Sequence, residues 1–124
     1  MVEMQPLLLI PDQLRAHPSL VWRGRHAHFS FMVGVGPDDY VLDISAGWLT
    51  QISLRALPTD SAQFTISATE EAWDLFWSPV PPRDFHDLFS MLAAGNLRLD
   101  GNLVPLMQHL QYIKDLLALP RRYA

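Results

Sequence analysis

The sequence contains no cysteine among its 124 residues. This absence excludes disulfide bonds, thiolate metal sites and a cysteine nucleophile, and it is typical of a protein that works in a reducing compartment. Long apolar runs are also missing, because the early run from Leu7 to Ile10 ends at Pro11. Such a run is too short for a membrane span or for the core of a signal peptide. We therefore expect a soluble cytoplasmic protein.

Basic residues are few and scattered, with eight arginines and the single lysine Lys114 against 13 acidic residues. The formal net charge is −4, and no basic stripe is present to follow a phosphate backbone. A glycine-rich phosphate loop is lacking too, because Gly34 and Gly36 are followed by Pro-Asp-Asp rather than by a helix. We expect neither a nucleic acid partner nor a cofactor.

Apolar residues, by contrast, make up 49% of the chain and charged residues 18%, which favours a packed core. The length suits one domain over residues 1–124, with an N-terminal segment over 1–20 and a core over 21–120. The segment between Pro11 and Leu20 predicts a short helix with Leu14 on its inner side.

Four stretches alternate apolar and polar residues with a period of two, which predicts strands at about 29–35, 40–45, 48–54 and 64–68. Glycine-containing turns separate the first three strands, which indicates an antiparallel meander. The predicted faces are Phe29, Phe31, Val33 and Val35; Tyr40, Leu42 and Ile44; Trp48, Thr50, Ile52 and Leu54; and Phe64, Ile66 and Ala68.

The period then changes to that of helices. Thr69 is a plausible N-cap of a helix that runs to about Trp77, and Asp84 is a plausible N-cap of the next helix. In the second helix, the spacing of the apolar residues predicts an inner stripe of Phe85, Leu88, Phe89 and Leu92, and Gly95 is expected to end the helix. A last helix is expected from about Leu103 to Leu119, capped by Asn102, with a stripe of Leu103, Leu106, Met107, Leu110, Ile113 and Leu117.

The block from Met91 to Asn102 resembles the signature of the sterol carrier protein 2 family. In that family a helix ends on glycine, a short apolar strand follows, and a second glycine precedes a polar cap and the final helix. Here Gly95, the strand Leu97-Arg98-Leu99 and Gly101 match that order. The resemblance implies an α+β fold in which a five-stranded, mostly antiparallel sheet carries helices on one face.

The resemblance further implies a cavity for a fatty acyl chain, a sterol or another apolar ligand between the sheet and the helices. The aromatic and aliphatic residues of the predicted faces would line it, with methionines as adaptable contacts. Trp77, in the connection between two helices, is expected near the entrance. The candidate lining residues are Phe29, Phe31, Phe64, Ile66, Trp73, Phe76, Trp77, Phe85, Phe89, Met91, Leu106, Met107 and Leu110.

Each of these residues could equally fill a solid core, and two other functions stay open. The fold could serve as a dimerisation or accessory module of a lipid-related or biosynthetic enzyme system. Alternatively, His86 and Asp87, or the pair His26 and His28, could act as acid and base in a small enzyme on a hydrophobic substrate. Capping explains the acids beside His86 and no zinc-binding motif is present, so we assign no catalytic residue and no metal ligand.

Overall fold

The computed structural model describes residues 6–54 and 62–122. Its elements are, in chain order, η1 (Pro6–Leu9), α1 (Ile10–Arg15), α2 (Pro18–Arg23), β1 (His28–Val35), β2 (Asp38–Ser45), β3 (Trp48–Leu54), β4 (Phe64–Ala68), α3 (Glu70–Phe76), α4 (Leu88–Ala93), β5 (Arg98–Gly101), α5 (Val104–Gln108), α6 (Leu110–Ala118) and η2 (Leu119–Arg122). Within these residues, no helix has both the length and the apolar character needed to cross a membrane.

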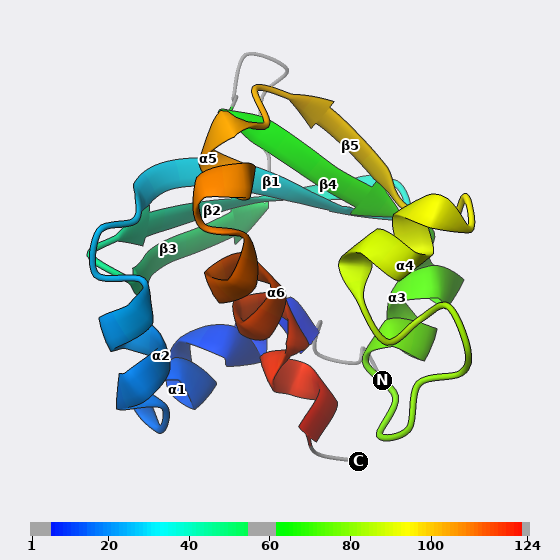
Figure 1. Cartoon of the computed structure of the whole chain (residues 1–124), viewed down its shortest axis with the longest axis horizontal. Coiled ribbons are helices and arrows are strands. Elements are labelled where there is room, and N and C mark those ends of the chain that lie inside the picture. Colours follow the sequence, from blue (N-terminus) through cyan, green and yellow to red (C-terminus); the bar gives the residue numbers. More distant parts are fainter. Residues whose placement is uncertain (1–5, 55–61, 123–124) are drawn as a thin grey trace.

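The five strands form one mixed sheet in the order β3-β2-β1-β4-β5. β1, β2 and β3 make the predicted antiparallel meander, β4 pairs in parallel with β1, and β5 pairs antiparallel with β4. Figure 1 shows the helices gathered on one side of this sheet. The predicted fold class, an α+β fold with a mostly antiparallel five-stranded sheet and helices on one face, is therefore confirmed.

The alternation of β1 and β4 sets the face that the helices cover. Phe31, Val33, Phe64 and Ile66 are almost fully buried, whereas Ser30, Met32, Thr65 and Ser67 point to the other side and are only half-buried. Successive side chains of a strand point to opposite faces, so this pattern places the aromatic side chains toward the helices. The core lies between this face and the helices.

The predicted face of β3 is wrong in its first half because the strand carries a β-bulge. Ile44 pairs with Leu49 and Asp43 pairs with Gln51, so Thr50 is an extra residue in the ladder. An extra residue switches the alternation. Leu49 is therefore buried, and Trp48, which the regular alternation would have turned inward, is 44% exposed.

The N-terminal helix prediction is confirmed in outline. The segment forms two short helices, α1 and α2, and Leu14 is fully buried. The prediction for α3 is confirmed in detail, because the Thr69 hydroxyl accepts a hydrogen bond from the amide of Ala72 at 3.1 Å. An N-cap of this kind satisfies one of the free amides of the first turn.

Asp84 does not begin the following helix. Its φ of 73° lies in the left-handed region, which a right-handed helix excludes, so α4 begins only after Asp87. The buried residues of α4 are Leu88 and Met91, whereas Leu92 of the predicted stripe is exposed. The helix ends as predicted at Gly95, whose φ is 83°; the amide of Asn96 donates to the carbonyl of Met91 at 2.8 Å.

The last predicted helix is broken in two. His109 has φ −124° and ψ 33°, which ends α5 and allows α6 to set off in a new direction. Pro105 lies in the first turn of α5, as expected. The N-cap is Leu103 rather than the predicted Asn102, although the side chain of Asn102 accepts from the amide of Val104 at 3.2 Å. The bend changes which residues face inward: Tyr112 and Leu116, absent from the predicted stripe, are buried, and Met107 is exposed.

Tyr112 joins α6 to one end of the sheet, at the turn between β2 and β3. Its hydroxyl donates to the carbonyl of Gly47 in the turn between β2 and β3. A Cβ at Gly24 would overlap the Tyr112 ring, and a Cβ at Gly47 would overlap the carbonyl of Val21. Glycine at both positions therefore makes the room in which the ring and the turn approach α2.

Replacing Tyr112 by phenylalanine should lower the free energy of unfolding by about 1–2 kcal/mol, because the carbonyl of Gly47 loses its buried donor. Urea unfolding followed by circular dichroism measures the change. Tyr40→Phe is the matched control, since Tyr40 is only partly buried and makes no hydroxyl hydrogen bond to the described residues. Equal losses in the two variants would contradict this role of Tyr112.

Burial also raises the pKa of Tyr112 above the ordinary tyrosine value. The unfolded chain loses the Tyr112 proton near pH 10, whereas the folded chain keeps it to higher pH. Above about pH 10 the folded state therefore binds more protons than the unfolded state, and the free energy of unfolding falls as the pH rises. Below about pH 10 the ionisation of Tyr112 does not make the free energy of unfolding depend on pH. We expect a shallower fall for Tyr112→Phe than for the wild type in unfolding curves recorded between about pH 8 and 11.

Candidate functional site

Three phenylalanines of the predicted lining form a cluster on the inner face of the sheet. Phe31 and Phe64 are stacked with ring centroids 5.1 Å apart, and Phe29 lies 6.0 Å from Phe31 and 5.8 Å from Phe64. The imidazole of His109, at the bend between α5 and α6, lies 5.5 Å from Phe29. β1 and β4 bring these rings together because the parallel register places Phe31 beside Phe64.

A second aromatic cluster is carried by α3. The Trp73 ring stacks on Trp77 at 5.0 Å and meets the edge of Phe76 at 5.5 Å. The indole N–H of Trp73 donates to the carbonyl of Gly34, and that of Trp77 donates to the carbonyl of Leu117, both at 2.8 Å. Trp77 is therefore buried and hydrogen-bonded to α6, and its position near an entrance stays a prediction.

The remaining predicted lining residues divide by exposure. Ile66, Met91 and Leu106 are buried in the same core, and Phe85 and Leu110 are partly buried against it. Phe89 is half-buried, with the ammonium group of Lys114 4.9 Å from its ring centroid. Met107 lies apart from the others, on the outer side of α5. It borders an open apolar groove of about 580 Å³ with Leu103 and Val104.

A polar groove of about 240 Å³ opens above Phe76, between the start of α4 and the α6–η2 segment. Lys114 pairs with Asp87 across it at 3.0 Å. Arg121 donates from Nε to the carbonyl of Phe76 at 2.8 Å and from Nη2 to the carbonyl of His86 at 2.9 Å. Its guanidinium carbon also lies 4.5 Å from the Phe76 ring centroid.

Two charged groups of this groove, Lys114 and Arg121, were not predicted as site residues. Burial lowers the pKa of Arg121 and the neighbouring Asp87 carboxylate raises it, and the guanidinium remains a cation at neutral pH. Lys114 and Arg121 are far from Asp87 in the sequence, and no periodicity connects them. A single lysine on an amphipathic helix is ordinarily a solvated residue, so the sequence carries no signal for the two cations, although it does single out Phe76, His86 and Asp87 of the same groove.

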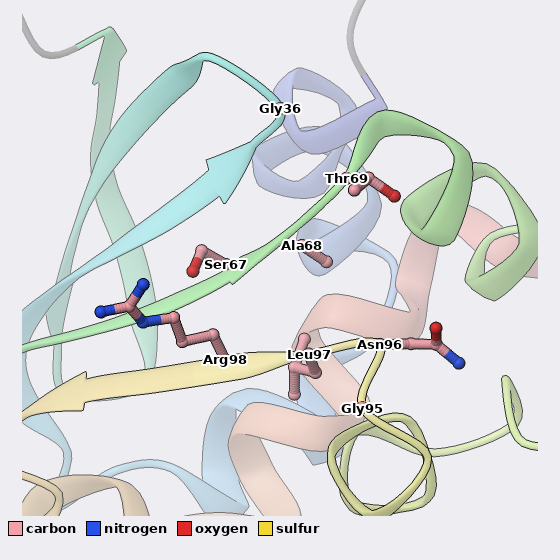
Figure 2. Close-up of a pocket in the computed structure, with 8 residues that line it drawn as sticks. All are labelled: Gly36, Ser67, Ala68, Thr69, Gly95, Asn96, Leu97 and Arg98. Atoms are coloured by element: carbon pink, nitrogen blue, oxygen red, sulfur yellow. The ribbon is translucent and has the colours of Figure 1, made fainter.

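A third groove, of about 530 Å³, lies where β4 ends and α4 leads into β5 (Figure 2). Ser67 and Arg98 pair across the strands, and their side chains lie on the side of the sheet away from the helices. Leu97 turns inward and is buried. None of the thirteen predicted lining residues borders this groove, whereas Phe76 borders the polar groove between α4 and the α6–η2 segment.

The histidines considered as catalytic groups belong to separate places. His28 accepts from the amide of Ala46 through Nδ1 at 3.3 Å, while His86 borders the polar groove with Asp87. The Asp87 carboxylate is held by Lys114, and the carbonyl of His86 by Arg121. Across residues 6–54 and 62–122, no three side chains of histidine, aspartate or glutamate gather as a metal site.

No protein-family model matches the sequence, and no curated protein is similar enough in sequence to match. Solved structures do match. A crystal structure of sterol carrier protein 2 is 19% identical, with a TM-score of 0.72, covering 96% of this chain and 95% of its own. A conserved hypothetical protein of Thermus thermophilus, described as a candidate sterol carrier protein, is 18% identical, with a TM-score of 0.67 and coverage of 98% and 87%.

A third match is UbiJ-SCP2, a ubiquinone synthesis protein, which is 19% identical with a TM-score of 0.56 and covers 91% of this chain and 89% of its own. These matches span nearly the whole chain, strands and helices alike. The resemblance that the block from Met91 to Asn102 indicated is thus confirmed at the level of the fold: the chain is built like sterol carrier protein 2.

Proposed function

We propose that this chain binds an apolar, lipid-like ligand between the inner face of the sheet and the helices. The observation that carries the proposal is the match of nearly the whole chain to sterol carrier protein 2, a protein named for sterol carriage. The aromatic residues of this chain support it, because they lie on the face where such a ligand would sit.

The two aromatic clusters would form the two ends of the binding space. Phe29, Phe31 and Phe64 lie on the sheet, and Trp73 and Phe76 lie on α3. The same core contains flexible side chains that can move between rotamers to make room for an acyl chain, namely Met91 and Leu106. Ile66, Trp77, Phe85, Phe89 and Leu110 complete the proposed lining.

Native mass spectrometry of the purified protein and titration with the neutral dye Nile red test this proposal. We expect a co-purified lipid mass or saturable dye uptake at one molecule per chain. An empty protein that takes up no dye would overturn the proposal.

A substitution that fills the proposed space provides a second test. Leu106→Phe should weaken Nile red binding by about fivefold, because the larger ring takes volume from the ligand. Leu92→Phe makes the same change on the exposed side of α4 and should leave binding unchanged. Thermal unfolding of both variants verifies that they are folded. Equal affinities in the two variants would place the dye elsewhere.

A second candidate function is that of a non-catalytic accessory module, either as a homodimer or bound to a partner enzyme. It is favoured by the match to UbiJ-SCP2, a ubiquinone synthesis protein. Val104, Met107 and Trp22 are more than half exposed and could be covered by a partner. Light scattering over a dilution series tests for a dimer. A monomer at all concentrations that also takes up Nile red would favour the carrier.

A further inference from the structure

We infer that the polar groove above Phe76 binds the carboxylate of the ligand, so that the favoured ligand class is long-chain carboxylic acids rather than neutral lipids. This inference rests on the proposed function and adds the chemistry of the ligand's headgroup. The groove has two cations, an apolar floor and a resident carboxylate that a ligand can replace.

The two cations face a shared space. The Lys114 side chain is 22% exposed and reaches the groove from α6, while Arg121 reaches it from η2. The two hydrogen bonds of Arg121 use Nε and Nη2, and Nη1 has no hydrogen-bond partner among the described residues. A guanidinium fixed in this way is a pre-oriented donor for a carboxylate oxygen.

The floor of the groove leads into the apolar core. Phe76 borders the groove, is 1% exposed, and its ring meets Trp73 and Trp77 at 5.5 and 6.3 Å. Leu88 also borders the groove and is buried. An acyl chain whose carboxylate lies between Lys114 and Arg121 would therefore have its first methylenes against the α3 cluster.

Asp87 is the resident carboxylate. It occupies the N-cap position of α4 but makes no capping hydrogen bond, because its side chain turns to Lys114 instead. A ligand carboxylate that takes over Lys114 would release Asp87, which could then accept from the free amides of the first turn of α4. The exchange keeps Lys114 paired and gives α4 a cap.

The other charged groups at the groove do not oppose an anion. Asp115 is paired with Arg23 at 2.7 Å and accepts from Gln111 at 3.0 Å, so its charge is already compensated. His86 is exposed and adds no negative charge. Once a ligand displaces Asp87 from Lys114, that lysine and Arg121 are the nearest partners for its carboxylate.

Competition of dodecanoate and 1-dodecanol against bound Nile red measures the preference for the headgroup. Wild-type protein should bind dodecanoate at least about tenfold more tightly than dodecanol, because a buried hydrogen bond to a charged group contributes more than a neutral one. Butyrate and inorganic phosphate, which carry the charge without the long chain, should not displace the dye. Displacement by either would overturn the assignment of a long-chain ligand.

Two variants test the groove itself. Lys114→Met should remove most of the preference for dodecanoate, and Asp87→Asn should tighten dodecanoate about threefold to fivefold by removing the competing carboxylate. Both substitutions should change the affinity for dodecanol much less than the affinity for dodecanoate, because the dodecanol hydroxyl carries no charge. Lys114→Arg retains the charge and should retain the preference, which separates a charge effect from a folding defect.

Arg15→Met and Asp12→Asn are matched controls, because they change the same charges in an exposed ion pair on α1. Both should behave as wild type. Equal affinities for dodecanoate and dodecanol, or the same response in the control variants, would overturn the inference and leave the proposed function standing. Failure of both ligands and of Nile red to bind would overturn the proposed function and this inference with it.

Discussion

The hydrogen bond from Tyr112 to the carbonyl of Gly47 connects the helical layer of the molecule to the sheet. α6 is nine residues long, lies against α1, α2 and η2, and reaches the turn between β2 and β3 through Tyr112. A helix of that length has little stability of its own and depends on tertiary contacts. Tyr112 supplies an aromatic contact and a polar bond at once, and Gly24 and Gly47 leave the space for it.

Side chains of other helices make the same kind of hydrogen bond to a backbone carbonyl of a neighbouring element. Trp73 reaches the carbonyl of Gly34 in β1, and Trp77 reaches the carbonyl of Leu117 in α6. Arg121 in turn binds carbonyls at both ends of the connection between α3 and α4. Long side chains with a polar end thus join short elements, and their buried polar atoms are satisfied by backbone groups near element ends.

Much of the fold follows from local patterns, and the errors have physical causes. Strand alternation located all four longer strands, and Thr69 and Gly95 marked helix ends correctly, because caps and periodicity act over a few residues. The bulge at Thr50, the left-handed Asp84 and the bend at His109 depend on tertiary context. The aromatic residues of the site were recognisable, whereas the groove of Lys114 and Arg121 exists only after distant segments meet.

The central position of β1 has a consequence for how the chain reaches this structure. β1 meets β2 through a short turn, but meets β4 only when Phe31 and Phe64 come together across the intervening meander. Contacts between distant residues form more slowly than those across a turn, because more chain entropy is lost first. We therefore expect the meander to form ahead of the parallel pair. Until β4 docks, Phe29 and Phe31 lie beside an open strand edge, which makes this the stage most exposed to aggregation.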